Sequence, residues 1–548
     1  MSRPAASDDL TFDYVVIGAG TAGCVLAARL SEDPDIRVCL IEPGGSERHP
    51  FVRIPAAVGA AIISKSLTWG FATEPQTCLD NRRIPLPRGR VVGGSGSING
   101  MAYYRGNARD FDDWAAMGNS GWSYSEVLPY FLRSEDNRDY PGSSFHAQGG
   151  PMRVSFVPGP NPLNEDFLAA MAELQFPACP DFGVAEPEGA GYRQGTIACG
   201  KRVSTATAYL RPALKRPNLI VMRGFARRLV ITEKRITGVE LQREDEIVTL
   251  AVRGEAIVCA GAFQSPQLLQ LSGIGPAAML KAAGIDPILN LPGVGAALQD
   301  HLAISVVMDA PRAPSYGISA RAMPRDIWSV FQYLFGKGQL GSNLFETTAY
   351  IRSKPGLDRP DMQVVFQPAR RNRNRFPLPL GHGYAISLVD LYPESRGTVT
   401  LAGSDPLAPP RIDPQLGSAR KDIDTLIRGV RLARRAFASP SFARYEATER
   451  MPGPLLSSDA ELEGYVRANA ATVHHPAGTC KMGTGADAVV DPQLRVHGIE
   501  GLRVVDASIF PRLIGGNTNA GTVMVAEKAS DMIRGRAAPA PIHLPRQA

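Results

Sequence analysis

"FDYVVIGAGTAGCVLAARL", from Phe12 to Leu30, is the stretch that decides the fold of this chain. A β-rich apolar run at 12–17 leads into a G-x-G-x-x-G turn and then into an apolar helical pattern. After a short break, a second apolar run, "RVCLI", ends at Glu42. The order strand, glycine turn, helix, strand, acid is typical of a dinucleotide-binding unit.

Each part of this unit has a physical reason. Gly18 allows the tight turn, Gly20 lets the backbone approach a pyrophosphate, and Gly23 lets the helix pack close to the strand. The helix N-terminus offers N–H donors and a positive dipole end to the phosphates. Glu42 would accept hydrogen bonds from ribose hydroxyls, and its charge disfavours the 2′-phosphate of NADP. The unit does not choose between NAD and FAD, and a tight turn without a ligand is the alternative.

Composition excludes several classes of protein. The 548 residues fit two or three domains, and 44% hydrophobic with 20% charged residues is typical of a globular protein. A net charge of +6 over this length does not indicate a nucleic-acid partner. We find neither a membrane-spanning apolar run nor an apolar signal core before the first strand, so we expect a cytoplasmic protein, with peripheral membrane contact left open. The seven cysteines are scattered and predict neither disulfides nor a metal site.

Two further segments bear on the cofactor. "RGRVVGGSGSINGMAYYRG", from Arg88 to Gly106, is rich in glycine and serine and could lie against a planar ring; a flexible loop is the alternative. Upstream, Trp69 could stack on a ring or fill a core. "AIVCAGAFQSPQLLQLSGIG", Ala256 to Gly275, predicts a strand, a turn at Gly261 and a helix.

Together these segments resemble the glucose–methanol–choline (GMC) oxidoreductase family, in particular its bacterial choline dehydrogenase-like members. Both family signatures are present, at Gly89 to Asp112 and Gly261 to Gly275, and the resemblance extends from about Phe12 to Asp531. It implies bound FAD. The residues implied to bind FAD are Gly18, Gly20, Thr21, Ala22, Gly23, Glu42, Trp69, Arg90, Val92, Gly94, Asn99, Gly100, Met101, Ala102, Ala226, Ala260, Asp506, Ala507, Asn517 and Thr518.

The resemblance also implies how the cofactor is attached. Some relatives tether the flavin through a histidine in the glycine-rich segment, and Ile98 stands at that position here. We therefore expect non-covalent FAD and no metal. Gly96 departs from the serine that many relatives have there.

The family implies an α/β fold with two domains. A Rossmann-like FAD-binding domain is expected from residues 1–155, 200–310 and 466–533. An α+β substrate-binding domain with an antiparallel sheet is expected from 156–199 and 311–465, where segments such as "MQVVF" and "YAISLVDLY" alternate with turns. The Pro- and Ala-rich tail at 534–548 is predicted to be disordered.

An arginine run, "RRNRNR" at 370–375, falls inside the second domain. A solvated loop is one interpretation. The other is a patch that attracts anions, acidic lipid headgroups or an acidic electron-acceptor protein.

"ATVHHPAGTCKMGTG", at 471–485, holds two adjacent histidines. Alcohol oxidation needs a base for the hydroxyl proton, and a neutral imidazole suits that role. Pro476 biases His475 toward extended geometry, and alternation along an extended chain would send His474 elsewhere. The family motif selects His475 as the base. His474 is expected either to pack and hydrogen-bond or to form a polar wall of the substrate pocket.

A second catalytic group is expected in "VVDASIFPRLIGGNTNAGTVMVAEKA", from 504 to 529, with a helix starting near Thr522. Relatives carry His or Asn at the position of Asn517, whose amide could hydrogen-bond the substrate oxygen. Asn519 is the nearby alternative, or a helix N-cap. Gly521 replaces a proline that is frequent in relatives.

We therefore predict an FAD-dependent enzyme that oxidises a small-molecule alcohol to an aldehyde or ketone. His475 would accept the proton, and a hydride would pass to flavin N5. The electron acceptor would be a quinone, a dye or O₂, and the sequence does not separate dehydrogenase from oxidase. The alternatives are a GMC-type lyase or light-driven decarboxylase, a NAD-binding protein, and a non-catalytic flavoprotein.

Overall fold

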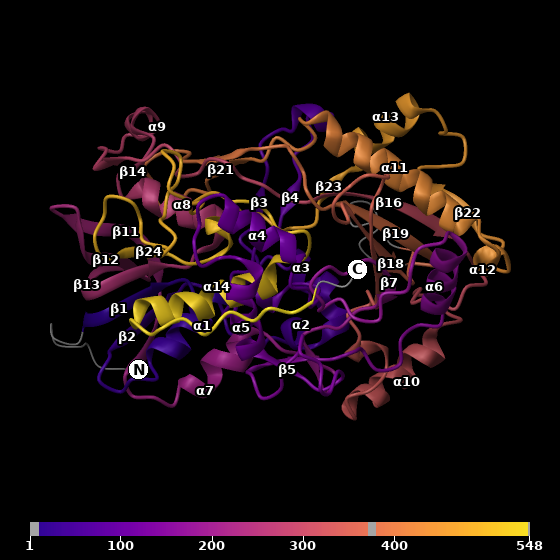
Figure 1. The fold of residues 1–548 in the computed structure, drawn as a ribbon, viewed down its shortest axis with the longest axis horizontal. Helices are drawn as coiled ribbons and strands as arrows, with labels where there is room; N and C mark the ends of the chain where they lie inside the picture. Colours follow the sequence, from indigo (N-terminus) through magenta and orange to yellow (C-terminus); the bar gives the residue numbers. More distant parts are fainter. Residues whose placement is uncertain (1–9, 371–379, 546–548) are drawn as a thin grey trace.

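A computed structural model describes residues 10–370 and 380–545 and places two seven-stranded sheets side by side (Figure 1). The first sheet has the order β10-β2-β1-β13-β12-β11, with β24 also paired to β13. Its strands are β1 (Thr11–Ile17), β2 (Val38–Glu42), β10 (Leu219–Arg223), β11 (Phe225–Thr232), β12 (Arg235–Arg243), β13 (Glu246–Val258) and β24 (Leu502–Val504). Strands β10, β2, β1, β13 and β24 are parallel, whereas β11 and β12 form an antiparallel extension.

The parallel part forms because its strands are apolar throughout and are covered by helices. β2 is buried along its whole length, and α1 (Thr21–Leu30) follows β1 directly after the glycine turn. α14 (Thr518–Ile533), from the C-terminal end, packs against α1 and α5 (Tyr124–Ser134) (Figure 1). Glu527 of α14 is fully buried and accepts hydrogen bonds from Arg29 and Tyr209. The layer around the first sheet thus joins early and late segments of the chain.

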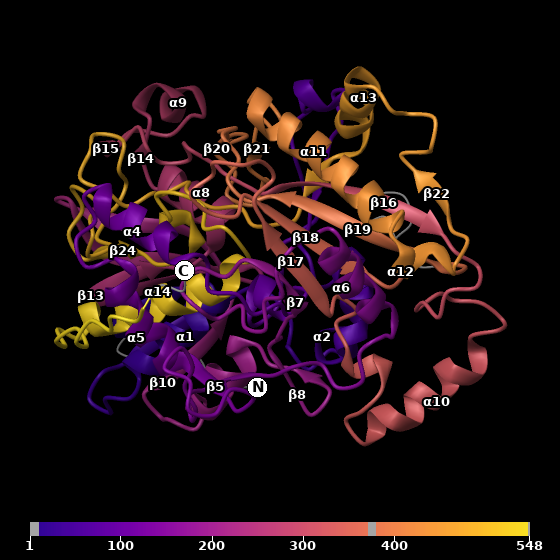
Figure 2. The ribbon, with the colours of Figure 1, turned by 45° about the vertical axis from the view of Figure 1, so that its right-hand side comes forward.

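The second sheet is antiparallel, with the order β22-β16-β19-β18-β17-β7 and β23 paired to β16. Its strands are β7 (Gly189–Tyr192), β16 (Leu302–Asp309), β17 (Thr347–Ile351), β18 (Met362–Gln367), β19 (Gly383–Asp390), β22 (Thr448–Met451) and β23 (Ala471–Thr472). α11 (Arg420–Phe437) covers one face, beside α13 (Asp459–Asn469), and α6 (Leu163–Glu173) lies near β7 (Figure 2). The opposite face of this sheet is turned toward the first sheet, and a cavity lies between them. The mixed α/β fold that we predicted is confirmed.

Further helices connect or cover the two sheets. They are α2 (Pro50–Arg53), α3 (Val58–Ile63), α4 (Ala108–Ala116), α7 (Arg211–Ala213), α8 (Gly261–Leu271), α9 (Ala277–Ala282), α10 (Met323–Leu334) and α12 (Pro440–Ala443). Short strand pairs are β3 (Phe71–Ala72) with β4 (Pro85–Leu86), β5 (Glu135–Asn137) with β6 (Met152–Val154), β8 (Ile197–Ala198) with β9 (Lys201–Arg202), β14 (Ile274–Gly275) with β15 (Leu289–Asn290), and β20 (Thr398–Thr400) with β21 (Arg411–Asp413).

Three details differ from the sequence prediction. β16 lies in the antiparallel sheet, so that sheet begins before residue 311, because residues 302–309 pair with β19. α14 begins at Thr518 rather than near Thr522. The tail is ordered over 534–545: the Ile542 N–H donates to the Ser125 carbonyl, and Ile542 and Leu544 pack against the first core. The apolar pair explains why a Pro- and Ala-rich tail is held in place.

The arginine run is described only at Arg370, which forms an ion pair with Asp309 at 3.0 Å. The other arginines of the run, Arg371, Arg373 and Arg375, lie outside the described residues. Of the cysteines, five are buried, and Cys78 and Cys199 are partly or fully exposed; all seven are free thiols.

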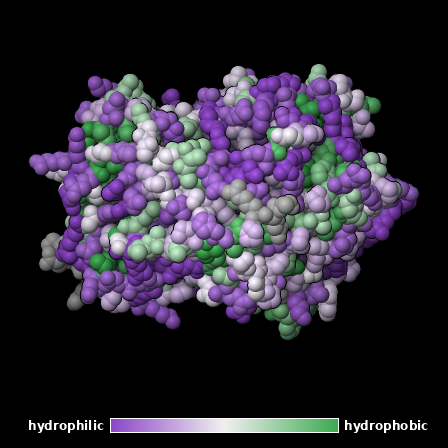
Figure 3. All heavy atoms as spheres, viewed as in Figure 1, coloured by the Kyte–Doolittle hydropathy of each residue, from purple (hydrophilic) through white to green (hydrophobic). Residues whose placement is uncertain are grey.

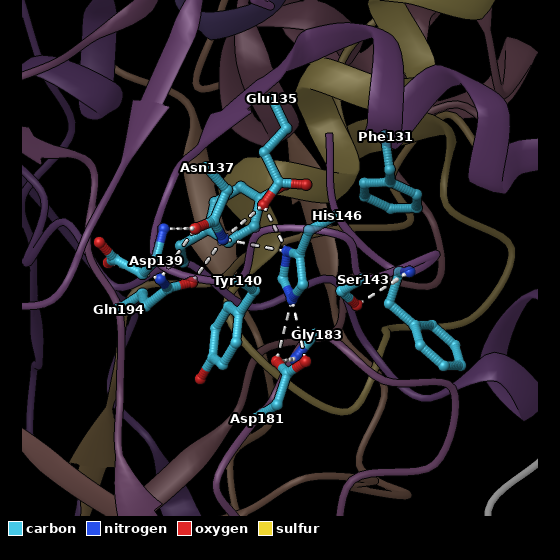
Figure 4. Close-up of polar contacts among 12 residues, drawn as sticks. Phe131, Glu135, Asn137, Asp139, Tyr140, Ser143, His146, Asp181, Gly183 and Gln194 are labelled. Carbon is cyan, nitrogen blue, oxygen red and sulfur yellow. Dashed lines mark hydrogen bonds and ion pairs between the residues drawn. The ribbon is translucent and has the colours of Figure 1, made fainter. Parts of the chain in front are cut away.

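A buried polar cluster ties β5 to the segment that follows β7 (Figure 4). The His146 ring lies between two carboxylates, with Nδ1 2.8 Å from Glu135 Oε1 and Nε2 3.0 Å from Asp181 Oδ2. Burial lowers the pKa of His146, but the hydrogen bonds to Asp181 and Glu135 outweigh it, so the pKa is raised. Asn137 Nδ2 extends the cluster to Gln194 Oε1 at 2.7 Å.

Candidate active site

A long cavity runs between the two sheets and contains most of the residues predicted to bind FAD or substrate. It begins at the carboxyl ends of β1 and β2, passes the glycine-rich segment, and ends against the inner face of the antiparallel sheet. The predicted residues that line it are Gly18, Gly20, Thr21, Ala22, Glu42, Trp69, Gly94, Asn99, Gly100, Met101, Ala102, Ala226, Ala260, Asp506, Ala507, Asn517, Thr518, His474 and His475.

Three predicted cofactor residues do not line the cavity. Gly23 lies behind it, where a Cβ would come 1.9 Å from the Gly18 carbonyl oxygen. Arg90 is exposed, with its guanidinium 5.0 Å from the centroid of the Trp69 ring. Val92 is partly buried and packs against the core of the first domain. Gly23 therefore lets α1 pack closely against the turn at Gly18. The Arg90 side chain lies near Trp69 and the Val92 side chain in the core, and neither lines the cavity.

The nucleotide end of the cavity has the features that an ADP moiety requires. The N-cap residue of α1 is Gly20, which provides no side-chain cap, and the first turn holds no acid, so the N-terminal N–H groups of α1 can receive an anion. Glu42 accepts hydrogen bonds from the Ala19 and Gly44 N–H groups at 2.9 and 2.7 Å. Burial raises the pKa of Glu42 to about 7. A carboxylate oxygen has further lone pairs, so Glu42 can also accept from ribose hydroxyls.

Close contact between two glycine segments shapes the middle of the cavity. Gly94 has φ of +54°, and a Cβ there would lie 2.8 Å from the Gly20 Cα. At Gly96 a Cβ would lie 2.7 Å from Thr21 Oγ1, so glycine fits the contact that a serine would crowd. This cradle fits an extended dinucleotide that passes from the glycine turn to the glycine-rich segment. Ile98, in the position of the tethering histidine, is buried and lines the cavity.

A pair of histidines lies at the reactive end. His301 is fully buried, and its Nδ1 is 2.9 Å from His475 Nδ1, with the two rings nearly perpendicular at 88°. His301 Nε2 lies 3.0 and 3.1 Å from the carbonyl oxygens of Leu391 and Ile514. Carbonyl oxygens only accept, so His301 carries its proton on Nε2 and its Nδ1 is an acceptor.

This arrangement assigns the proton on the second ring. His475 Nδ1 must donate to His301, which leaves the lone pair of His475 on Nε2. Burial lowers the pKa of His301 to about 4, so His301 stays neutral and keeps accepting. His475 Nε2 is 3.1 Å from Asn517 Nδ2 and is thus an acceptor that faces the cavity.

Asn517 is the residue that contacts His475 Nε2. It is the N-cap residue of α14, but its side chain does not cap the helix. Its Oδ1 is buried and has no hydrogen-bond partner among the described residues, while Nδ2 donates to His475. Unsatisfied buried polar atoms are rare in folded proteins and point to a missing ligand. Asn519, the alternative, accepts from Thr21 Oγ1 at 2.9 Å and so joins α14 to α1.

The geometry of the two adjacent histidines differs from our expectation. His474 has φ of +68°, in the left-handed region, so the pair is not an extended dipeptide and the alternation argument is wrong. The His474 N–H donates to Thr472 Oγ1 at 2.8 Å, and its carbonyl accepts from Arg88 Nη1 at 3.1 Å. Both histidines line the cavity. The His475 N–H donates to Asp300 Oδ1 at 2.8 Å, which fixes the backbone of the second histidine.

The far wall comes from the antiparallel sheet and carries uncharged polar groups. Alternate residues of β18 and β19 line the cavity on this face, as the period of a strand requires, and they are Gln363, Val365, Gln367, Ser387 and Val389. β16 contributes the consecutive residues Ala303, Ile304 and Ser305. Among the described residues, the carboxylates lining the cavity are Glu42, at the nucleotide end, and Asp506, which accepts from the Gly261 N–H and Ser265 Oγ.

Among the described residues, two arginines line the cavity, Arg88 and Arg193, and Arg193 directly follows β7 of the antiparallel sheet. It lines the cavity, is only 8% exposed, and its Nε donates to the Phe345 carbonyl. Burial lowers the pKa of Arg193 to about 10, so it remains cationic at neutral pH.

The described residues contain no cluster of histidines, cysteines or carboxylates that could hold a metal ion.

Sequence comparison identifies the family. The family models "GMC oxidoreductase", N- and C-terminal, match residues 12–303 and 393–526. The chain belongs to the GMC oxidoreductase family. The resemblance drawn from the glycine motifs is therefore confirmed, and so is the prediction of an oxidoreductase. Among the described residues, no helix has the length and apolar character needed to cross a membrane.

This GMC oxidoreductase is similar to several named enzymes. It is 40% identical to the alcohol dehydrogenase (acceptor) of Pseudomonas putida, over 95% of both chains. It is 42% identical to the oxygen-dependent choline dehydrogenase of Sinorhizobium fredii, over 96% of both chains. Pyridoxine 4-oxidase from Mesorbium loti superposes with a TM-score of 0.86 at 32% identity, covering 96% of this chain and 100% of that one. A formate oxidase of Aspergillus oryzae, studied for FAD modification, gives 0.89 at 27% identity, covering 96% and 98%.

Sequence reasoning missed His301 and the polar wall of this GMC oxidoreductase. His301 follows "LPGVGAALQD", a segment in which we recognised no catalytic motif, and its partner lies 174 residues away. A signal was present in the scarcity of histidine, since the chain has only eight. The wall residues could be predicted only from the register of the antiparallel sheet.

Proposed function

We propose that this protein binds FAD non-covalently and oxidises an uncharged alcohol, with His475 as proton acceptor and Asn517 as the group that holds the alcohol oxygen. The observation that carries the proposal is the histidine pair, because it presents an unprotonated Nε2 to the cavity beside the Asn517 amide nitrogen, which can donate to the alcohol oxygen. Relatives named for alcohol oxidation support the reaction class, and none of those cited is named a lyase or decarboxylase.

The chain's residues divide the work as follows. The substrate hydroxyl donates its proton to His475 Nε2 while His475 Nδ1 keeps donating to His301. Asn517 Nδ2 has a second hydrogen that the substrate oxygen can accept, and this bond strengthens as negative charge develops there. Bound FAD supplies the two-electron acceptor that receives the hydride from the alcohol carbon. The cradle at Gly20 and Gly94, the N-terminus of α1 and Glu42 would hold its nucleotide part.

Two finer points belong to the same proposal. Ile98 cannot form the covalent link of a histidine, so FAD should be released intact by acid or heat. Arg193 places a positive charge in the wall that faces the substrate, which favours an uncharged alcohol over a quaternary ammonium alcohol such as choline.

A cytoplasmic location and a quinone, dye or O₂ acceptor stay part of this proposal. So does the assignment of residues 1–155, 200–310 and 466–533 to the FAD-binding domain and of 156–199 and 311–465 to the substrate-binding domain, except that β16 and β23 pair within the antiparallel sheet of the second domain.

Anaerobic stopped-flow tests the assignment of the base. We expect His475→Gln to slow flavin reduction by alcohol by about 10²–10⁴-fold, the scale of a general base, with FAD still bound. His474→Gln is the matched control, since it changes the adjacent cavity-lining histidine and should alter KM more than the reduction rate. A normal rate in His475→Gln together with a lost rate in His474→Gln would reverse the assignment.

A further inference from the structure

Helix α10 carries a wide apolar face that the rest of the chain leaves open. It projects from the molecule beside the antiparallel domain (Figure 2), and apolar side chains gather at the corresponding lower edge of the surface (Figure 3). Seven large apolar residues of the helix and its C-cap are 53% to 80% exposed. They are Met323, Ile327, Trp328, Val330, Phe331, Leu334 and Phe335.

The spacing of these residues places them on one side of the helix. Positions 323, 327, 330, 331 and 334 follow the three- and four-residue steps of a helical face. The opposite side packs on the protein: Ser329 is buried, and Asp326 accepts from Arg325 and from Gln339 Nε2 at 2.9 Å. The polar groups of α10 thus turn inward, and its outward face offers only apolar side chains.

The charges at the edge of this face are positive. Arg321 precedes the helix, Lys337 follows it, and both are exposed. The single carboxylate of the helix, Asp326, is neutralised by Arg325 at 2.9 Å. An apolar face that includes tryptophan and phenylalanine and is bordered by cations is the pattern of a helix that lies in a lipid–water interface.

We propose that α10 inserts its apolar face into the surface of a membrane that contains anionic lipids. A protein partner fits less well, because protein interfaces carry about one hydrogen bond per 100–200 Å², whereas the side chains of this face offer a single donor, the Trp328 indole N–H, and no acceptor. Lipid acyl chains require none. Trp328, 62% exposed, takes the depth at which tryptophan is enriched, and Arg321 and Lys337 meet the phosphate groups.

The insertion would bring the cavity to the membrane surface. From α10 the chain passes through residues 339–341 to Phe345, which lines the cavity. Residues 339–341 pack against residues 55–57, directly before α3, and Val58 and Ile62 of α3 also line the cavity. A membrane-bound enzyme could thus exchange an apolar alcohol or its electron acceptor with the bilayer.

Vesicle flotation with the FAD-loaded, full-length protein tests this proposal. We expect the protein to float with vesicles of phosphatidylcholine and phosphatidylglycerol and to bind phosphatidylcholine vesicles at least about tenfold more weakly. The triple variant Trp328→Ser, Phe331→Ser, Leu334→Ser should lose binding by about tenfold or more while its alcohol-dependent dye reduction stays unchanged. The matched control is Ile247→Ser, Leu407→Ser, Leu455→Ser, which removes three other exposed apolar residues and should float like the wild type.

Tryptophan quenching locates the contact. Trp114 and Trp122 are fully buried and Trp69 lines the cavity. Quenching by brominated lipids should therefore fall strongly in Trp328→Phe, which removes the exposed indole, while flotation persists. Failure of the wild type to float with anionic vesicles would overturn the proposal. So would a wild-type dimer that the triple variant converts to monomer without any vesicle binding, because α10 would then join two copies of the chain. Equal flotation of both triple variants would also overturn it.

Discussion

His301 Nδ1 lies 2.9 Å from His475 Nδ1, and the first ring decides which nitrogen of the second is free to accept a proton. The two carbonyl groups that accept from His301 Nε2 fix the His301 proton on that nitrogen, so His301 Nδ1 accepts the proton of His475 Nδ1. The proton acceptor of the proposed reaction therefore depends on a residue that does not itself touch the substrate.

Replacing His301 with leucine should slow flavin reduction by about 10- to 100-fold, the usual effect of losing a partner that orients a reactive ring. Leucine has no acceptor for the His475 Nδ1 proton, so the His475 ring can take the wrong tautomer. The pH dependence of the reduction rate should also shift, which a loss of packing alone would not cause. His497→Leu is the control, since that histidine bonds to the Gly483 carbonyl outside the cavity.

Replacing Gly94 with alanine should weaken FAD binding by about tenfold or more, because the new Cβ would lie 2.8 Å from the Gly20 Cα and φ is +54°. Titration of apoprotein with FAD, followed by flavin fluorescence, measures the change. Gly403→Ala serves as control, since a Cβ there meets nothing within 4 Å. Equal Kd values for both variants would contradict the cradle described at Gly20.

Choline should be a poorer substrate than 3,3-dimethylbutan-1-ol, its uncharged analogue of nearly the same shape. The positive charge of Arg193 in the cavity wall repels the quaternary ammonium, and we expect kcat/KM to differ by at least about tenfold. Arg193→Leu should bring the kcat/KM values for the two alcohols closer together. A cooperative thermal unfolding transition with a Tm near that of the wild type would show that this variant is folded. A preference for choline in the wild type would rule out this role of Arg193.

His146 should make stability depend on pH. Its folded pKa is raised above the ordinary value of 6.5 because its hydrogen bonds to Asp181 and Glu135 outweigh burial. Its contribution is therefore complete below about pH 6.5 and is lost as pH rises through the folded pKa. Urea unfolding from pH 5.5 to 9 should show this loss in the wild type and not in His146→Gln. The exposed His543→Gln should retain the wild-type profile.

Glu527→Ala should destabilise the protein by about 3–5 kcal/mol, because it leaves arginines beside an empty buried site. Arg29 Nη2 and Arg133 Nε lie 2.8 and 3.0 Å from the Glu527 carboxylate, which is fully buried. Glu32→Ala removes the exposed partner of Arg29 at 2.9 Å and should cost only about 0–1 kcal/mol. Urea unfolding measures the free energy of unfolding of both variants. Equal losses of stability would contradict the stabilising role of the buried Glu527 carboxylate.

The parts of this protein that local sequence determines could be predicted. Gly18 and Glu42 belong to one continuous unit whose spacing follows from the geometry of a strand, a turn and a helix. His301 could not be found in this way, because its function arises only when the start of β16 meets a segment far along the chain. The left-handed φ of His474 could not be predicted either, since the Arg88 side chain that bonds to the His474 carbonyl comes from a distant segment.

The packing of α14 against α1 has a consequence for biosynthesis. Asn517, Thr518 and the buried Glu527 complete the cavity and the first domain, yet the ribosome makes them after almost all of the rest. Until α14 is made, a nascent chain exposes the apolar side of α1 and an unfinished cofactor cradle. Assembly of the cofactor site therefore has to wait for α14, and a chain cut short before Asn517 would lack both the reactive end of the cavity and the helix that covers α1.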